Sequence, residues 1–395
     1  MINRLLNICI VQPGKHVYSE TFVRTHAEHL PGTVTVVYGE TFPTHTVDGV
    51  RLADVYLKRN MAAQFAQLFC KILPAFIANK IPSKLKGYPF DEALDEVALA
   101  HFLTQKKIDV VLAEFFLKGV IVQEVCTKMG VPLVVHTHGG GDIVGVTDIQ
   151  WYGPMYPDFF KNVAYVIAVD YFSVAQLIAL GLPKEKLVTI GYGIDLNLFT
   201  QTSPAVNPPH FFAVGRLVDK KAPMLTLLAF AKVLQTYPEA RLQLGGNGNL
   251  YDACLQLVNA LKISQAVEFL GVLQPQEVAY KMQHSRAFVQ HSVHTTYGDS
   301  EGTPVAMLEA MACGLPVIST MHNGIADTIT HNVDGYLVPE FDVDAMAAGM
   351  CKVLEDGEYA NRLGAAARAK IAGDFEVLDT IEKLHLVLQK AHREQ

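Results

Sequence analysis

The stretch "EGTPVAMLEAMACGLPVIST", Glu301–Thr320, decides the fold of the region around it. Its apolar first half has the length of a helix, and "PVIST" after it is typical of a short buried strand. Two carboxylates, Glu301 and Glu309, stand eight positions apart and bracket the apolar segment. Thr303 has a good N-cap side chain and Pro304 suits the first helical position, so we expect the helix to begin there.

The start of this helix predicts an anion-binding site. Its free N–H groups and positive dipole end attract an anion, and Gly302 lets a phosphate come close to the backbone. Glu301 and Glu309 would then lie beside whatever the phosphate carries. Carboxylates accept hydrogen bonds from sugar hydroxyls, so the combination indicates a sugar nucleotide. The alternative is that both acids are solvated charges flanking a core helix.

Outside this stretch, short apolar runs alternate with longer helical patterns, which is typical of parallel βαβ units. We expect strands that begin at Leu6, Thr33, Asp109, Leu133, Ala164 and Lys186, and then at His210, Ala240, Ala266, Ala287 and Pro316. Prolines and small polar residues between Gly193 and His210 indicate a linker. The pattern predicts two doubly wound α/β domains, at 1–195 and 208–372, followed by a helical segment at 373–395.

Composition excludes several classes of protein. The chain has 395 residues, half of them hydrophobic, and a formal net charge of -7. We see no basic stripe, so a nucleic-acid partner is not expected. The six cysteines form no C-x-x-C pair, which argues against a disulfide framework and a zinc site and fits a reducing cytoplasm. No apolar run reaches the ~18 residues of a membrane-spanning helix, and the N-terminal "LNICIVQ" is better interpreted as a strand than as a signal peptide.

The segment 61–86, "MAAQFAQLFCKILPAFIANKIPSKLK", combines apolar and basic residues. One interpretation is an amphipathic surface that rests on anionic lipid at the inner face of the cell membrane. The other is a buried helical hairpin with exposed lysines. Both interpretations stay open from the sequence.

Several ordered motifs resemble those of the retaining GT-B glycosyltransferases of glycosyltransferase family 4, also called glycosyl transferases group 1. The acid-bracketed stretch, with "NGIADTI" and "DGYLVPEFD" after it, resembles the family's main motif. "FFAVGRLVDKKAP" resembles its phosphate-binding segment, "LGGNGNL" its glycine turn and "YGIDLNLF" its interdomain segment. In the first half, "SETFV" and "HTHGGGD" are similar to members that build bacterial surface polysaccharides.

The resemblance implies a GT-B fold, in which two Rossmann-like domains face each other across a cleft and the C-terminal helix crosses back to the first domain. It also implies residue roles in the second, donor-binding domain. Arg216 and Lys221, with Gly302 and Thr303, would bind the donor diphosphate, which suits a guanidinium fork and a point cation five residues apart. Glu309 would bind the ribose hydroxyls and Glu301 would contact the transferred sugar. The base would lie near Asn247, Gly248, Leu270 and Gly271.

In the first domain, the resemblance implies a histidine over the donor sugar. His136 or His138 fits by spacing, and we favour His138 because it follows the end of a strand, where open α/β sheets place ligands. Gly14, after the first strand, is a candidate for close approach to the diphosphate. The sequence departs from the family pattern at Ala222, where glycine is common, and at Asp327, where a longer acid is usual.

The expected reaction is transfer of a hexose-type sugar from a nucleotide diphosphate, UDP being the first choice, to a hydroxyl of a glycan or a lipid-linked acceptor, with retention. No cofactor or metal is expected, because the single Asp-x-Asp pair, Asp342 and Asp344, precedes a helical segment and is explained by helix capping. A sugar-nucleotide epimerase of the same fold and a non-catalytic sugar-nucleotide-binding regulator are the alternatives.

Overall fold

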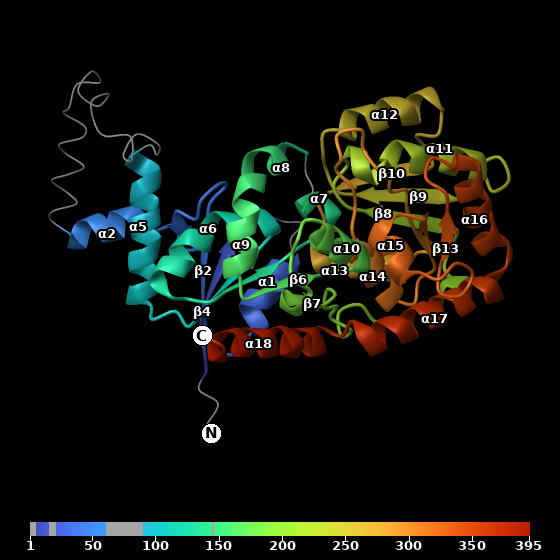
Figure 1. Ribbon diagram of the computed structural model, residues 1–395. Coiled ribbons are helices and arrows are strands. Elements are labelled where there is room, and N and C mark those ends of the chain that lie inside the picture. The colour runs from blue at the N-terminus through green and yellow to red at the C-terminus, as the bar shows by residue number, and fades with distance from the viewer. Residues whose placement is uncertain (1–4, 16–20, 61–89, 144–145) are drawn as a thin grey trace, which may run out of the picture.

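The computed structural model describes residues 5–15, 21–60, 90–143 and 146–395, and these form two α/β halves (Figure 1). The amphipathic segment 61–86 lies outside the described residues. In the described part of the chain, no helix is long and apolar enough to cross a membrane.

The first sheet has seven strands in the order β3-β2-β1-β4-β5-β6-β7, and only the β2–β3 pair is antiparallel. The strands are β1 (Asn7–Gln12), β2 (Thr33–Tyr38), β3 (His45–Thr46), β4 (Val110–Glu114), β5 (Leu133–His136), β6 (Tyr165–Ala168) and β7 (Leu187–Thr189). The central strands are buried along their whole length, which explains why they are continuous apolar runs in the sequence.

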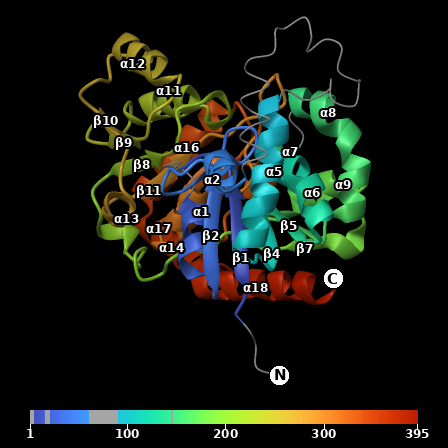
Figure 2. The same cartoon turned by 90° about the vertical axis from the view of Figure 1, so that its left-hand side faces the viewer.

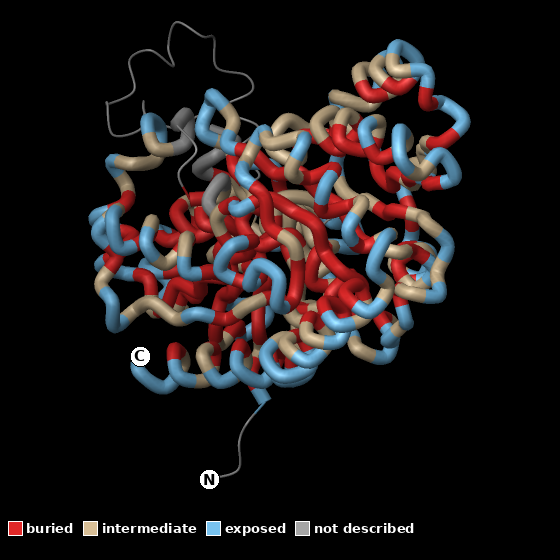
Figure 3. Tube along the Cα trace, turned by 90° about the vertical axis from the view of Figure 1, so that its right-hand side faces the viewer, coloured by how far each residue is buried: buried red, intermediate tan, exposed pale blue. Residues whose placement is uncertain are grey.

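The second sheet has six parallel strands in the order β10-β9-β8-β11-β12-β13. They are β8 (His210–Val214), β9 (Arg241–Gly245), β10 (Val267–Gly271), β11 (Ala287–Gln290), β12 (Val317–Thr320) and β13 (Tyr336–Val338). The expectation of two doubly wound domains is therefore confirmed. Figure 3 shows buried residues gathered at the centre of the molecule and exposed residues mostly at its periphery.

Helices cover both faces of each sheet. In the first half they are α1 (Thr21–His29), α2 (Leu52–Arg59), α5 (Phe90–Gln105), α6 (Phe116–Met129), α7 (Gly140–Ile143), α8 (Val146–Tyr152), α9 (Tyr156–Asn162) and α10 (Tyr171–Ala179). In the second half they are α11 (Pro223–Val233), α12 (Tyr251–Ala260), α13 (Pro275–Gln283), α14 (Val305–Ala312), α15 (Asn323–Thr328), α16 (Val343–Glu355), α17 (Gly357–Asp374) and α18 (Val377–Arg393). Short 3-10 turns occupy Gly153–Met155, Lys184–Lys186, Pro204–Val206 and Asp219–Lys221.

The last helix, α18, crosses back to the first half, as expected. Figures 1 and 2 show α17 beside the second half and α18 running under the strands of the first. Its buried face, which includes Ile381, Leu384 and Leu388, packs into one apolar cluster with Ile8 of β1 and Leu112 of β4. Their spacing along the helix is the spacing of one helical face, which explains why the end of the chain has a helical period.

Every strand expected from the sequence is present. The sequence interpretation missed β3 and β13, which are two and three residues long. Runs this short carry too few apolar residues to show a period, and their pairing with β2 and β12 determines their conformation.

Candidate active site

The fold places the predicted donor loops at a switch point of the second sheet. β8 lies between β9 and β11, so the chain leaves β8 and β11 toward opposite sides, and open α/β sheets bind ligands outside such a point. The loop after β8 contains Arg216 and Lys221, and the loop after β11 leads to Glu301. The two loops touch, because the Val293 N–H donates to the Lys220 carbonyl at 2.9 Å. A small cavity at the carboxyl ends of β8, β9 and β11 is lined by residues that include Gly215, Arg216, Lys221 and Gln290.

Lys221 and Glu301, which the sequence assigned to different parts of the donor, form an ion pair. Lys221 Nζ lies 2.6 Å from Glu301 Oε2, and the two side chains are 15% and 14% exposed. Burial alone would raise the pKa of Glu301, but the cations Lys221, Lys220 and Arg216 outweigh it and lower the pKa to about 2. Glu301 is therefore a carboxylate at neutral pH, held by the lysine beside the cavity.

Arg216 and Lys220 complete the positive charge at this point. Arg216 is exposed and, among the residues that the structure describes, has no acidic side chain within ion-pair distance. Lys220 is committed to the loop after β11, with Nζ 3.0 Å from Asp299 Oδ1. The structure thus leaves Arg216 available for an anion and gives Lys220 a role in joining the two loops.

The helix after Glu301 begins later than the sequence predicted. α14 starts at Val305 with Pro304 as its N-cap residue, so the expectation that Thr303 caps the helix and Pro304 opens it was wrong. Thr303 is drawn away from the helix by the first domain, because its hydroxyl donates to Asp170 Oδ2 at 3.4 Å.

The structure shows a steric requirement for glycine at position 302 that the sequence did not reveal. A Cβ on Gly302 would lie 2.7 Å from the Cα of Gly139 and 2.8 Å from Asp170 Oδ2, both in the first domain. Only a glycine permits this approach between the domains. Gly302 and Thr303 therefore lie at the domain contact, and whether they also bind a phosphate stays a prediction.

Glu309 lies on the second turn of α14, as expected, and is half-buried. Burial raises its pKa to about 7. No cationic side chain among the residues that the structure describes forms an ion pair with Glu309. Burying such a carboxyl group, which is close to half-protonated at neutral pH, is costly for the fold and is typical of a functional group.

The residues expected at the base lie in adjoining turns after β9 and β10. Leu217 N–H, in the loop of Arg216, donates to the Asn247 carbonyl at 2.9 Å, and the Gly246 N–H donates to the Gly271 carbonyl. Asn247 is exposed, while Gly248, Leu270 and Gly271 are partly buried. The structure therefore brings Asn247, Gly248, Leu270 and Gly271 to the same edge of the sheet as Arg216.

In the first domain, His138 and His136 are both buried, at 2% side-chain exposure each. His138 Nε2 lies 2.8 Å from Glu114 Oε2, and His26 Nδ1 lies 2.8 Å from Glu114 Oε1. Burial lowers the pKa of His138, and Glu114 opposes this only in part. The N–H at Nε2 donates to Glu114, which leaves Nδ1 of a neutral ring as a buried acceptor with no partner among the described residues.

Glu114 and Tyr192 join His138 to the rest of the site. Glu114 ends β4 and is fully buried, and its pKa lies well below the usual range because His26 and His138 outweigh the effect of burial. The Tyr192 ring stacks on His138 with centroids 5.8 Å apart, and burial raises the Tyr192 pKa, with the acids Asp170 and Glu301 adding to the effect. The strand "DVVLAEF" could have revealed Glu114, since an acid at the end of a buried strand requires a partner.

Gly14 follows β1 in a bend, and its carbonyl accepts a hydrogen bond from Gln12 Nε2 at 2.7 Å. Gly14 thus lies at the carboxyl edge of the first sheet, next to the switch point between β1 and β4. This is the position from which a first-domain loop could approach a ligand, and a contact with diphosphate stays a prediction.

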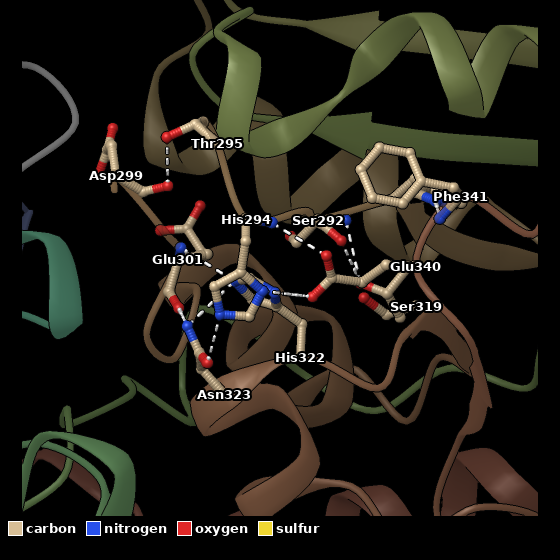
Figure 4. A network of polar contacts seen from close by, with 12 residues as sticks. Ser292, His294, Thr295, Asp299, Glu301, Ser319, His322, Asn323, Glu340 and Phe341 are labelled. Atoms are coloured by element: carbon tan, nitrogen blue, oxygen red, sulfur yellow. Dashed lines mark hydrogen bonds and ion pairs between the residues drawn. The ribbon is translucent and has the colours of Figure 1, made fainter. Parts of the chain in front are cut away.

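A polar network behind Glu301 was not anticipated from the sequence. Glu340 Oε1 accepts from Nδ1 of His322 at 2.6 Å and from Nδ1 of His294 at 2.7 Å (Figure 4). Asn323 and Glu301 belong to the same network. The motifs "NGIADTI" and "DGYLVPEFD" contain Asn323 and Glu340, but no spacing rule predicts that these two residues belong to one network.

In the described ranges, two groups of three side chains lie close enough to hold a metal ion: His26, Glu114 and His136, and His294, His322 and Glu340. Hydrogen bonds connect His26 to Glu114 and both His294 and His322 to Glu340. The Asp-x-Asp pair lies elsewhere. Asp342 caps α16 by accepting from the Ala345 N–H at 2.8 Å, and Asp344 pairs with Lys232, so the capping interpretation is confirmed.

Two family descriptions match the chain. Glycosyltransferase Family 4 matches residues 20–198, and Glycosyl transferases group 1 matches residues 197–370. Among curated proteins, WcaL of Salmonella typhimurium, assigned to colanic acid biosynthesis as a glycosyltransferase, is 29% identical over 94% of this chain and 96% of its own. The amylovoran biosynthesis glycosyltransferase AmsK of Erwinia amylovora is 27% identical over 95% of this chain and 97% of its own.

Solved structures show the same fold. HepE of Anabaena, in complex with UDP, has a TM-score of 0.74 at 18% identity and covers 98% of this chain and 100% of its own. Sucrose-phosphate synthase of Thermosynechococcus elongatus has a TM-score of 0.71 at 17% identity and covers 99% of this chain and 100% of its own. The two halves of the chain are therefore arranged as in these two-domain proteins.

Proposed function

Since the chain is a GT-B glycosyltransferase that matches family 4 and group 1 in its successive halves, we propose that it transfers a hexose-type sugar. The donor would be a nucleoside diphosphate sugar, and the acceptor would be a hydroxyl of a growing surface polysaccharide. The observation that carries this proposal is a cavity at the switch point of the second sheet that is lined by Arg216 and Lys221, with Glu301 paired to Lys221. WcaL and AmsK, which align with nearly the whole chain, support the polysaccharide as the product.

The donor would lie across the loops after β8 and β11. Arg216 and Lys221 would neutralise the diphosphate, and the N–H groups at the start of α14 would add to this charge. Glu309 would accept hydrogen bonds from the ribose hydroxyls, and the base would rest against Asn247 and Leu270. UDP is the first nucleotide to test, because HepE was solved with UDP and with UDP-glucose.

The sugar would lie between Glu301 and the first domain. As the bond to the leaving oxygen of the diphosphate breaks, the positive side chains stabilise the growing negative charge on that oxygen. The carboxylate of Glu301, freed from Lys221 by the arriving phosphate, can accept hydrogen bonds from the sugar. His138 Nδ1, which has no hydrogen-bond partner in the described part of the chain, is the acceptor that the first domain would offer to a sugar hydroxyl.

We also propose that the transfer retains the anomeric configuration and needs no divalent cation, because protein cations already surround the diphosphate position. The acceptor would be a glycan or a lipid-linked glycan bound by the first domain, at the cytoplasmic face of the membrane. The test is release of nucleoside diphosphate from a panel of UDP-, GDP- and dTDP-hexoses in the presence of lipid-linked oligosaccharide extract, with product anomers assigned by NMR.

A further inference from the structure

The tripeptide His322-Asn323-Gly324, at the start of α15, docks onto the tripeptide Glu301-Gly302-Thr303. His322 Nε2 accepts a hydrogen bond from the Glu301 N–H at 3.1 Å, and Asn323 Nδ2 donates to the Glu301 carbonyl at 2.8 Å. Both backbone polar groups of Glu301 are therefore held by two consecutive side chains (Figure 4). A Cβ on Gly324 would lie 2.4 Å from Thr303 Oγ1, so the third position admits only glycine.

Glu340 determines which tautomer of His322 is present. His322 is fully buried, and its Nδ1 lies 2.6 Å from Glu340 Oε1. A carboxylate can only accept, so Nδ1 carries the proton and Nε2 presents the lone pair that the Glu301 N–H requires. Burial lowers the pKa of His322, which favours the neutral ring, although Glu340 opposes this effect.

Asn323, which also binds the backbone of Glu301, has a strained backbone conformation. Its φ is +36°, in the left-handed region that residues other than glycine rarely adopt, although asparagine tolerates it better than most. This conformation accompanies the hydrogen bond from Asn323 Nδ2 to the Glu301 carbonyl. Strain of this kind persists where the surrounding contacts impose it, and it is common at functional sites.

We propose that His322 and Asn323 are positioning residues that hold the backbone of Glu301, and that Glu340 sets the tautomer of His322 on which this depends. With its backbone fixed on both sides, Glu301 can move only by side-chain rotation between Lys221 and the donor sugar. The role in catalysis rests on the proposed function, whereas the backbone contacts themselves do not.

Two substitutions of His322 separate its two nitrogens. The amide of glutamine reaches the position of Nε2, so His322→Gln keeps an acceptor for the Glu301 N–H. The shorter asparagine reaches the position of Nδ1, so His322→Asn keeps the donor to Glu340 and loses that acceptor. We expect His322→Asn to slow sugar transfer by about 10- to 100-fold, the size of effect that a displaced catalytic group produces, and His322→Gln to stay within about threefold of wild type. Affinity for UDP, which lacks the transferred hexose, should be the same in both.

Hydrogen exchange at the Glu301 amide, measured by mass spectrometry with fragmentation to single residues, gives a readout that does not need activity. The amide should exchange faster in His322→Asn than in His322→Gln and wild type. Asn323→Gly, which suits the positive φ but lacks the side-chain donor, is the second variant if the histidine variants fold poorly, and it should slow transfer while leaving UDP affinity unchanged.

Equal exchange of the Glu301 amide and equal turnover in His322→Asn and His322→Gln would overturn the inference. So would a loss of UDP affinity in Asn323→Gly as large as its loss of turnover. If the exchange difference is found but wild type consumes no sugar nucleotide of the panel, the backbone contacts are confirmed and the proposed function is the part that fails.

Discussion

Lys221, which lines the cavity at the switch point of the second sheet, forms an ion pair with Glu301, with Nζ and Oε2 2.6 Å apart. Lys221 cannot pair fully with both the Glu301 carboxylate and a diphosphate. We therefore expect donor binding to weaken or break the ion pair between Lys221 and Glu301. The pair keeps Glu301 ionised and holds its side chain close to the cavity until the phosphate arrives.

Single substitutions of this pair should have opposite effects on UDP binding. Lys221→Gln should weaken UDP by about 10- to 100-fold, the usual value of a hydrogen bond to a charged group. Glu301→Gln should bind UDP at least as tightly as wild type, because Lys221 is released, and should slow transfer by about 100-fold. Calorimetric titration with UDP and turnover measurements check both. Weaker UDP binding in Glu301→Gln would contradict the expected weakening of the ion pair.

Glu309 should give UDP binding a pH dependence. Its pKa is about 7 in the folded chain, and only the ionised carboxylate accepts from both ribose hydroxyls. We expect UDP affinity to rise between pH 6 and pH 8 more steeply in wild type than in Glu309→Gln, and to be lower in the variant at pH 8. If UDP affinity changed with pH in the same way in wild type and in Glu309→Gln, Glu309 would not be a ligand of the ribose.

The same group should affect stability in the opposite sense. Its pKa is raised from 4.5 in the unfolded chain, so the folded state holds the proton more tightly, and stability is lost as the pH rises from 4.5 through 7. Glu309→Gln, neutral throughout, should therefore have a higher Tm than wild type at pH 8, by about 2–4 °C for each kcal/mol gained, and a Tm close to that of wild type below pH 4.5.

Glu114 should be among the most sensitive positions of the first domain. Its pKa is depressed in the folded chain, so the stability that it contributes is present above pH 4.5 and is lost as the pH falls below that value. Glu114→Gln breaks a buried charged network and should cost about 3–5 kcal/mol at pH 7. Glu124→Gln is the control, because its pair with Lys128 is exposed and should contribute no more than about 0.5 kcal/mol. Chemical denaturation checks both, and equal small losses would mean that the histidines do not depend on Glu114.

Activity should survive removal of divalent cations. Excess EDTA should leave turnover within about twofold, and Asp342→Asn should be as active and as stable as wild type, because asparagine caps a helix as well as aspartate does. A loss of turnover in EDTA that Mg²⁺ or Mn²⁺ restores would show that Arg216 and Lys221 are not sufficient for the leaving diphosphate.

The sequence was sufficient to predict the regular strands and helices of the fold. Strand and helix periods predicted both sheets, and the helical period after Val377 predicted α18. The local start of α14 was predicted wrongly, because Asp170, far away in the sequence, binds Thr303 and overrides its capping preference. His322 and Glu340 were missed because a buried hydrogen bond between distant residues leaves no periodic signal, whereas Glu114 was overlooked although its place at the end of a buried strand is a local signal. The sequence assigned a role to Lys221 and to Glu301, but it did not predict their ion pair, because only the tertiary fold brings these two residues together.

The most direct test of sugar transfer is mass spectrometry of donor mixtures incubated with the purified protein and lipid-linked oligosaccharide extract. Our account predicts that one sugar nucleotide of the UDP-, GDP- and dTDP-hexose panel is consumed, that the matching nucleoside diphosphate appears in equal amount, and that an acceptor gains the mass of one hexose residue. Conversion of a sugar nucleotide to an isomer of the same mass without release of nucleoside diphosphate, or consumption of none of the panel, would contradict it.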